Sequence, residues 1–369
     1  MSARQYVGEA ARVLDVAIYQ QQQEHKVIAA FKKNYTPEAS AIQKGIIPVS
    51  LFFSSKFHLW QDFHDIRAIR KIVRQEKINI LHAHRGKDHI QACFANAPVL
   101  IRSRHVVTPI RNHFFNRRIY STFTDGMICV SKAVEHVVRE SLPKYNKPLV
   151  VIPGGAQSIP IVSESEVQTL RKNLNINNSS PILVCLARIA PVKGQHILLK
   201  SIPELLKKYP KLICIFAASR ESESYRAELN NEINILGISN AVRWLGHLES
   251  IAPLMKIAAI GVIPSLGSEG WSRVAVEFLR SGVPVVASRV GSLAEIVQEN
   301  VTGELVTPND PTALSKALLK VIDDKRYAES VTERQPDFNK CFSAERVAND
   351  ELLFYHRVMN IKGSRELRT

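Results

Sequence analysis

The stretch PSLGSEGWSRVAVEFLRSGVPVVASRVGSLAEIVQENVTG, from Pro264 to Gly303, indicates the fold class of this chain. After a polar Ser/Gly loop, apolar residues recur at helical spacing, and Gly282 and Pro284 follow them as they often follow a helix C-terminus. A short apolar run at 283–287 then predicts a buried strand, and a second Gly/Ser turn begins another helix. This order of elements is typical of a doubly wound α/β domain.

Two carboxylates flank the start of the first helix in this stretch. Glu269 and Glu277 are eight residues apart, and a pair of glutamates alone would more often mark a solvated helix face. The helix start between them, however, offers backbone N–H groups without helical partners and a partial positive charge, which suit a phosphate group. We therefore consider the stretch a candidate phosphate-binding site.

The combination of motifs is more specific than either glutamate. Ser268-Glu269-Gly270, Glu277 and the run SGVPVVA at 281–287 together resemble the donor-site signature of the family-4 retaining glycosyltransferases with the GT-B fold, of the bacterial surface-polysaccharide or lipopolysaccharide type. The resemblance implies an α/β protein of two doubly wound, Rossmann-like domains facing a cleft. It also implies transfer of a sugar from a nucleotide-diphosphate sugar to a glycolipid or polysaccharide acceptor, with retention of configuration.

The resemblance assigns roles to residues at matching positions. It implies four catalytic residues, which are His105, Arg188, Lys193 and Glu269. It also implies seven residues that bind the donor, which are Gly246, His247, Leu248, Gly270, Trp271, Ser272 and Glu277. By the same resemblance, Glu269 would hold hydroxyls of the transferred sugar and Glu277 the ribose hydroxyls. His105, which follows the strand expected at 99–101, would approach the donor from the other domain, although a solvated basic turn is the alternative.

Two cations near the start of the second domain can replace a metal ion. Arg188 and Lys193 lie on one predicted strand-to-helix loop, from which a guanidinium fork and an ammonium group can both reach a diphosphate. The chain contains no Asp-x-Asp sequence of the kind that holds a divalent metal in many glycosyltransferases. We expect a metal-independent reaction with no cofactor besides the nucleotide-sugar co-substrate. His82 and His84 are expected to be structural or to line the acceptor site.

Length and composition favour two soluble globular domains. The 369 residues are 45% apolar and 22% charged, and the expected domains are 1–156 together with a terminal helix in 343–369, and 157–342. The segment 157–166 is expected to be a linker. Of the five cysteines, all except Cys341 lie in apolar segments, which predicts buried free thiols. With no signal peptide, we expect a cytoplasmic protein, with peripheral binding at the inner face of the membrane as an option.

The positive charge is concentrated in the first half of the chain. Residues 1–160 carry 23 Lys and Arg against 11 Asp and Glu, whereas the whole chain has a net charge of +15. No nucleic-acid-binding signature accompanies this charge, so we expect no nucleic-acid partner. The segment 111–123, which alternates Arg with Phe and Tyr, could lie on an anionic membrane or cap the N-terminal core.

The predicted elements alternate along the chain. N-terminal strands are expected at 27–31, 46–49, 78–81, 99–101, 126–130 and 149–152, with helices at 4–22, 62–76, 88–95, 114–124 and 132–142. The C-terminal strands are expected at 182–187, 212–217, 242–245, 259–263, 283–287 and 304–306. A terminal helix is expected to begin near 342 and to reach about 359.

The family resemblance implies a strand and a Gly-Gly loop ahead of the helix at 4–22, and neither is found there. We therefore expect the N-terminal domain to lack its first strand, because Met1 is an internal residue of a longer natural chain or because the gene is truncated. Two other functions remain open, the first because of the missing strand and the second because it shares the fold, although the pair Glu269 and Glu277 argues against the second. One is a catalytically impaired protein that binds nucleotide sugars or membrane surfaces, and the other is a sugar-nucleotide epimerase with the GT-B fold.

Overall fold

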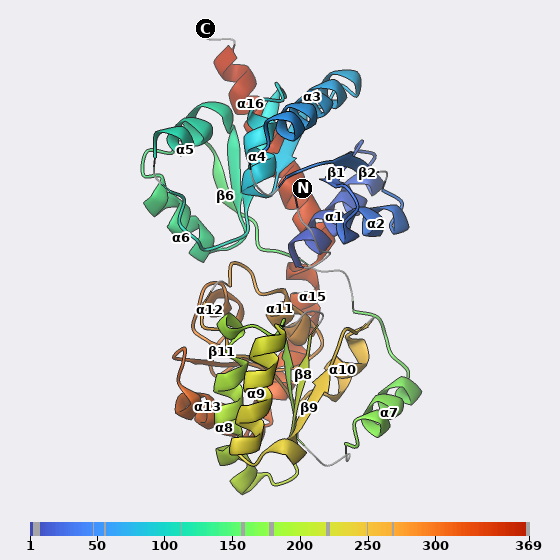
Figure 1. Ribbon diagram of the computed structural model, residues 1–369, viewed down its shortest axis with the longest axis vertical. Coiled ribbons are helices and arrows are strands. Elements are labelled where there is room, and N and C mark those ends of the chain that lie inside the picture. The colour runs from blue at the N-terminus through green and yellow to red at the C-terminus, as the bar shows by residue number, and fades with distance from the viewer. Residues whose placement is uncertain are drawn as a thin grey trace. The chain divides into compact units, whose positions relative to one another are not determined.

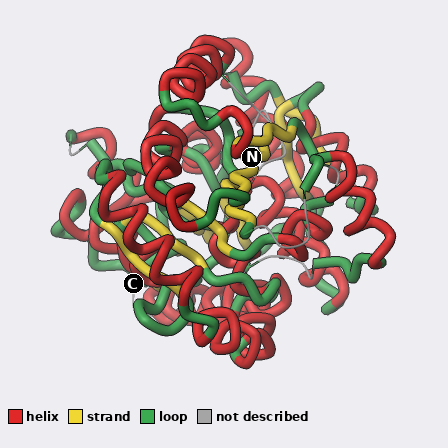
Figure 2. Tube along the Cα trace, turned by 90° about the horizontal axis from the view of Figure 1, so that it is seen from below, coloured by secondary structure: helices red, strands yellow, loops and turns green. Residues whose placement is uncertain are grey.

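A computed structural model of the protein (Figure 1) consists of two compact units, Met1–Gln157 with Phe342–Thr369 and Ser158–Cys341. In both units, strands lie among helices (Figure 2). The residues that the structure describes are 1–2, 8–46, 48–54, 57–111, 113–155, 159–176, 181–218, 222–248, 250–267 and 269–366.

The N-terminal unit contains two parallel sheets, ordered β1-β2 and β3-β4-β5-β6. The strands are β1 Ala29–Lys32, β2 Pro48–Leu51, β3 Ile80–Ala83, β4 Val99–Arg104, β5 Gly126–Cys129 and β6 Leu149–Val151. The helices are α1 Gly8–Gln22, α2 Thr36–Gln43, α3 Leu59–Gln75, α4 Gly86–Cys93, α5 Phe114–Arg118, the π-helical turn η1 Ile119–Phe123, α6 Lys132–Ser141 and α16 Ala344–Glu366. Among the described residues, no strand precedes α1.

The C-terminal unit is built on one six-stranded parallel sheet with the order β12-β11-β10-β7-β8-β9. Its strands are β7 Ile182–Leu186, β8 Ile213–Ala217, β9 Val242–Leu245, β10 Ile260–Ile263, β11 Val285–Ser288 and β12 Gly303–Val306. Its helices are α7 Glu164–Asn173, η2 Pro191–Lys193, α8 Gln195–Lys208, α9 Glu223–Ile235, η3 Ser239–Ala241, α10 Ala252–Ile257, α11 Arg273–Arg280, α12 Leu293–Ile296, α13 Pro311–Asp323, α14 Arg326–Glu333 and α15 Gln335–Cys341.

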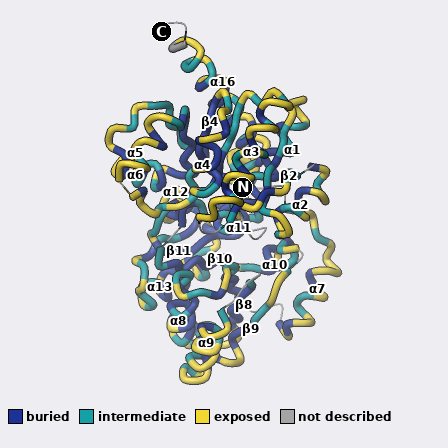
Figure 3. Tube along the Cα trace, turned by 45° about the horizontal axis from the view of Figure 1, so that its top comes forward, coloured by how far each residue is buried: buried dark blue, intermediate teal, exposed yellow. Residues whose placement is uncertain are grey.

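Both units have apolar cores around their strands. Strands β4, β10 and β11 are buried almost throughout (Figure 3), because helices cover them on both faces. In the N-terminal unit, α1 and α16 pack together and cover β4. The cysteine prediction is confirmed, since Cys341 is exposed and the other cysteines are buried free thiols.

Three strands of the N-terminal unit, β1, β2 and β3, begin two residues later than the sequence predicts. For β2 and β3 the end of the preceding helix explains the difference. Ile46 and Ile78 are apolar, but each donates its backbone N–H to a carbonyl in the last turn of the preceding helix, at Ala41 and Val73 respectively. The residue before each, Gly45 and Lys77, has positive φ. This is the arrangement of a Schellman helix end, in which the apolar residue packs back on the helix. The strands therefore start two residues further on.

Two other predicted segments were wrong in part. The helix expected at 114–124 is a short α-helix, α5, that continues as the π-helical turn η1. The linker expected at 157–166 includes the start of α7, because Ser163 and Glu166 form a reciprocal capping box that begins a helix. Residues 4–7 of the expected first helix lie outside the described residues.

The order of the C-terminal sheet brings two loops together. Strands β7 and β10 are hydrogen-bonded neighbours, so the loops that follow them emerge at the same edge. The backbone N–H of Leu266 donates to the carbonyl of Val192 at 2.9 Å. Gly194 has φ of +68°, and a Cβ atom there would overlap the carbonyl oxygen of Pro264. Glycine at 194 therefore allows the close approach of the two loops.

We predict that Gly194→Ala lowers the free energy of unfolding by roughly 2 kcal/mol or more, since it adds steric overlap to the ~1 kcal/mol that alanine costs at positive φ. The matched control is Gly237→Ala, where φ is +66° and a Cβ atom would have no neighbour within 4 Å. Urea denaturation measures both. Equal losses in the two variants would contradict the close loop approach.

Candidate functional site

A side-chain contact between two predicted site residues joins the loops after β7 and β10. The ammonium group of Lys193 donates to Glu269 Oε1, and the Oγ of Ser265 donates to the same oxygen at 2.7 Å. Glu269 is 5% exposed. Lys193 retains 19% exposure of its side chain, so the ammonium group lies at the boundary between the carboxylate and solvent. The structure thus brings together a cation and a carboxylate separated by 76 residues.

The loop after β11 fixes the backbone of the Glu269 segment. The backbone N–H of Ser292 donates to the carbonyl of Glu269 at 2.8 Å, and the backbone N–H of Ser272 donates to the Oγ of Ser292 at 3.1 Å. Gly291 has φ of +52°, and a Cβ atom there would overlap the Glu269 carbonyl oxygen. The Gly291-Ser292 turn is therefore the support of the Glu269 loop. Ser268 lies outside the described residues.

Helix α11 follows this loop with Ser272 as its N-cap, and Glu277 is the fifth residue of the helix, just beyond its first turn. Gly270 and Ser272 are buried, and Trp271 is half-buried. Arg273, which the family resemblance does not explain, donates from Nε to Glu277 Oε1 at 2.8 Å. The guanidinium group therefore faces the carboxylate that the resemblance assigns to the donor ribose, and it does not point simply to solvent.

The other predicted site residues of this unit, the catalytic candidate Arg188 and the donor-binding candidates at 246–248, follow β7 and β9. Arg188 is exposed beyond the end of β7, and its backbone carbonyl accepts a hydrogen bond from the side chain of buried Gln195 at 2.8 Å. Gly246 and His247 are exposed after β9, and Leu248 is half-buried. Because β8 lies between β7 and β9, these residues share the sheet edge with Lys193. We find no hydrogen bond between them and the Lys193–Glu269 pair among the described residues.

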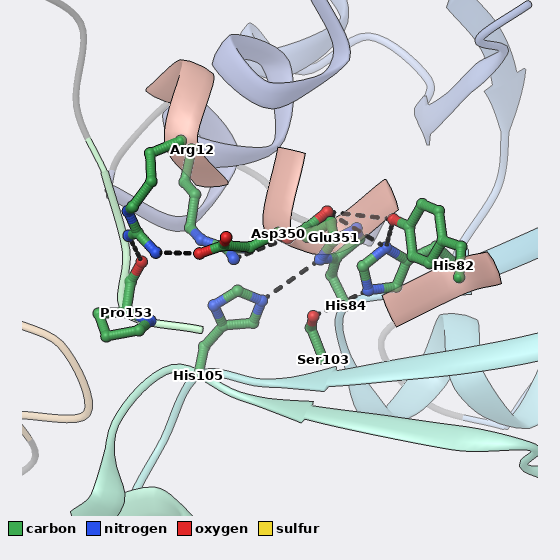
Figure 4. Close-up of polar contacts among 10 residues, drawn as sticks. Arg12, His82, His84, Ser103, His105, Pro153, Asp350 and Glu351 are labelled. Atoms are coloured by element: carbon green, nitrogen blue, oxygen red, sulfur yellow. Dashed lines mark hydrogen bonds and ion pairs between the residues drawn. The ribbon is translucent and has the colours of Figure 1, made fainter. Parts of the chain in front are cut away.

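In the N-terminal unit, His105 belongs to a chain of histidines at the ends of β3 and β4 (Figure 4). Its Nε2 lies 3.3 Å from Nδ1 of His84. The ring of His84 stacks obliquely on that of His82, with 4.1 Å between ring centroids. His82 in turn contacts the Oγ of Ser103 at 2.8 Å through Nε2. His105 therefore contacts the pair His82 and His84, which has a structural role beside it.

The same network continues into helices α1 and α16. Tyr355 contacts His82 Nδ1 at 2.6 Å and donates to Glu351 at 3.0 Å, while Arg12 donates to the other oxygen of Glu351 at 2.7 Å. Arg12 is 5% exposed and Glu351 is 2% exposed, so the ion pair is buried. A buried pair of this kind tolerates the loss of one partner poorly, because the other charge remains without compensation.

Burial determines the protonation of these histidines. It lowers the pKa of His82 to about 4, and it lowers the pKa values of His84 and His105 well below the usual range, where the other histidines and Arg12 add to the effect. His105 is consequently neutral near pH 7. A neutral imidazole with one nitrogen directed at His84 can offer the other nitrogen as a hydrogen-bond partner.

Sequence reasoning did not find the residues that support these groups. Arg12 and Glu351 are 339 positions apart, and no motif joins them. One signal was present, because Arg12 lies within the apolar run AARVL at 10–14, where a charge is a sign of a buried partner. Ser265, Gln195 and the Gly291-Ser292 turn were not assigned a supporting role.

The fold and the sequence agree on the class of protein. Residues 8–157 match the family described as Glycosyltransferase Family 4, and residues 166–337 match the family described as Glycosyl transferases group 1. The chain belongs to the GT-B glycosyltransferases, one family description covering each unit.

Solved structures support the same fold over almost the whole chain. A glycosyltransferase from Rickettsia africae has a TM-score of 0.83 and 19% identity, covering 95% of this chain and 94% of that one. An Anabaena protein solved with UDP-glucose has a TM-score of 0.80 and 21% identity, covering 95% and 96%. A lipopolysaccharide outer core galactosyltransferase has a TM-score of 0.70 and 13% identity, covering 95% and 97%.

Among curated proteins, a D-inositol 3-phosphate glycosyltransferase of Corynebacterium urealyticum is 25% identical over 276 residues, which cover 69% of this chain and 65% of that protein. The chain spans from about half to three quarters of the length of this and three other similar curated proteins. In the described part of the chain, no helix has the length and apolar character needed to cross a membrane.

We predict that His82 makes the protein acid-sensitive. Because the folded-state pKa of about 4 is below the usual 6.5, the unfolded chain takes up the proton first as the pH falls. The neutral His82 side chain therefore contributes fully to the free energy of unfolding above pH 6.5. This contribution falls by about 3 kcal/mol between pH 6.5 and pH 4. Urea denaturation measures the free energy of unfolding at pH 7 and at pH 4. Between these two pH values, His82→Gln should lose about 3 kcal/mol less than the wild type loses.

The control for this prediction is His136→Gln, since the side chain of His136 is 74% exposed. This variant should retain the pH dependence of the wild type. If His82→Gln and the wild type lose the same free energy of unfolding between the two pH values, burial does not keep His82 neutral.

Proposed function

We propose that the protein transfers a sugar from a nucleotide-diphosphate sugar to a glycolipid or polysaccharide acceptor, with retention of anomeric configuration and without a metal ion. The observation that carries the proposal is the Lys193–Glu269 contact at the carboxyl edge of the C-terminal sheet, where doubly wound sheets bind their ligands. The family matches and the similarity to a structure solved with UDP-glucose support a nucleotide-sugar donor.

The charges at this edge suit the departure of a diphosphate. When the bond between the anomeric carbon and the phosphate oxygen breaks, negative charge grows on the leaving group. Lys193, Arg188 and the N-terminus of α11 supply positive charge and N–H donors from fixed positions, which is the most effective form of transition-state stabilisation. In this proposal, the diphosphate takes over a contact of Lys193 that Glu269 now holds.

Glu269 is then free to accept hydrogen bonds from the transferred sugar, and Ser265 keeps its carboxylate oriented. Glu277 would accept hydrogen bonds from the ribose hydroxyls, while Arg273 donates to its Oε1. The acceptor hydroxyl would attack from the face of the leaving group, forming the new carbon–oxygen bond as its proton passes to the departing phosphate oxygen. His105 would bind the donor as a neutral hydrogen-bond partner.

The basic N-terminal unit favours an anionic acceptor or surface. Phe114 and Phe115 on α5 are 71% and 48% exposed, next to the exposed Arg117 and Arg118. Exposed aromatic side chains beside cations suit the headgroup region of an anionic membrane. A relative that acts on inositol 3-phosphate and a similar fold in a lipopolysaccharide galactosyltransferase are consistent with a phosphorylated glycolipid acceptor.

We predict that Lys193→Ala and Glu269→Gln each reduce the rate of sugar transfer ~10²-fold or more, the usual cost of removing one charge-stabilising contact. The measurement is the rate of nucleotide diphosphate release in the presence of EDTA, which removes divalent metal ions. It is compared with and without a lipid extract that supplies the acceptor. The matched control is Lys207→Ala on α8, because Lys207 pairs with Glu204 on the exposed surface.

Near-normal transfer by either site variant would contradict the proposed roles, as would activity that disappears in EDTA and returns with a divalent ion. Nucleotide release that is equally fast without acceptor, accompanied by a changed sugar configuration, would favour an epimerase. Donor binding with no turnover at all would favour a binding protein.

A further inference from the structure

Helix α3 of the N-terminal unit begins with a group of large apolar side chains that are open to solvent. Phe57 and Leu59 are 80% and 66% exposed, and Trp60 and Phe63 are 79% and 60% exposed. The helix lies beside α4 (Figure 1). A single exposed apolar side chain needs no explanation, but four of them within residues 57–63 indicate an interaction surface. We call these four residues the apolar end of α3.

The exposed face of α3 continues beyond the apolar end as a row of cations. The row begins four residues after Phe63, and each member lies three or four residues from another, which is the spacing of one helix face. Its exposed members are Arg67, Arg70, Lys71 and Arg74. The acidic residues of α3, Asp62 and Asp65, are buried. The exposed face of this helix therefore combines apolar and positive side chains and carries no negative charge.

The two buried carboxylates fix the backbone around the apolar end. Asp65 accepts hydrogen bonds from the backbone N–H groups of Phe52 and Phe53 at 2.9 and 2.8 Å, and Asp62 accepts one from that of His58 at 3.0 Å. Phe53 has φ of +40°, a conformation that a bulky residue adopts only when its surroundings enforce it. The exposure of the apolar end is therefore a fixed feature of the fold.

We propose that the exposed face of α3 binds an anionic lipid surface. The apolar end would enter the boundary between headgroups and acyl chains, where Trp and Phe side chains are favoured. The row of cations would lie at the level of the headgroup phosphates, to which Lys and Arg are attracted. The proposal goes beyond sugar transfer and concerns a helix other than α5, and binding at this face needs neither donor nor acceptor.

The composition of this face favours a lipid surface over other partners. A second copy of the chain related by a two-fold axis would place the same cations opposite one another. A single-stranded nucleic acid stacks its bases on aromatic rings, and Leu59 offers no ring. A neutral glycan would leave four cations without a partner. An anionic lipid surface alone provides both an apolar layer and negative charge.

The first test is sedimentation of the full chain with vesicles, either of phosphatidylcholine alone or of phosphatidylcholine mixed with anionic phosphatidylglycerol. We expect binding to the mixed vesicles, and we expect it to weaken as salt is added. Two double variants of α3 address the two parts of the face. Trp60→Ala/Phe63→Ala and Arg67→Glu/Lys71→Glu should each weaken binding to the mixed vesicles at least ~10-fold.

Each double variant has a matched control elsewhere in the chain. Ile235→Ala/Leu353→Ala removes two apolar side chains that are 76% and 70% exposed on α9 and α16. Lys207→Glu/Lys316→Glu reverses two exposed cations of α8 and α13, with the same change of net charge as the α3 charge variant. Both controls should bind vesicles as the wild type does, so that position is separated from overall apolarity and charge.

A second test detects insertion of Trp60. Its fluorescence should be quenched by brominated phospholipids in the mixed vesicles, because the indole would lie at the depth of the upper acyl chains. Trp60→Phe keeps an apolar ring, so this variant should still bind the vesicles. It should lose most of the quenching, since the two other tryptophans, Trp244 and Trp271, are half-buried in the C-terminal unit.

Several results would overturn the proposal. Unchanged vesicle binding in both α3 double variants is one, and a loss in Arg117→Glu/Arg118→Glu alone would place the contact on α5. Binding of single-stranded RNA without binding of vesicles would make the face a nucleic-acid site. A dimer seen by light scattering, and lost in Trp60→Ala/Phe63→Ala, would mean that a second copy covers the face. Because vesicle binding is measured without nucleotide sugar, none of these results depends on whether the protein transfers a sugar.

Discussion

The C-terminal unit depends on the hydrogen-bonded pairing of β7 with β10. These strands are 78 residues apart at their first residues, and their pairing puts the cation loop of one beside the carboxylate loop of the other. The contact between Lys193 and Glu269 follows from this adjacency, as does the need for glycine at 194. The Lys193 side chain keeps 19% of its exposure beside the buried carboxylate, so a charged ligand in solvent can reach the ammonium group and compete for it.

The sequence revealed most of this unit because its signals are local. The alternation of apolar strands and helices locates the elements, and the Gly282 and Pro284 pair marks the end of α11. What could not be read was the support of Glu269. Ser292 contacts its segment from the loop after β11, and Ser265, four residues before Glu269, belongs to no motif. The contact of Arg273 with Glu277, which the family resemblance assigns to the ligand, was not predicted.

The N-terminal unit was harder to predict. The apolar residues Ile46 and Ile78 suggested strand starts, but they end the preceding helices. The predicted starts of β2 and β3 were therefore two residues too early. The network from Arg12 through Glu351 and Tyr355 to His82 joins the two ends of the chain, and only a folded unit can bring them together. Burial of that network makes the histidines neutral, which a strand-end His-Ala-His sequence does not reveal by itself.

The central claim is that the cations and the helix N-terminus of the C-terminal unit bind a nucleotide diphosphate without a metal ion. Calorimetric titration of the full chain with UDP-, GDP- and ADP-sugars, in EDTA and then in excess Mg²⁺, tests it most directly. The account predicts that at least one donor binds with a Kd of ~1 μM to 1 mM in EDTA, and that Mg²⁺ changes it little. Binding of none of these donors, or binding only with Mg²⁺, would contradict it.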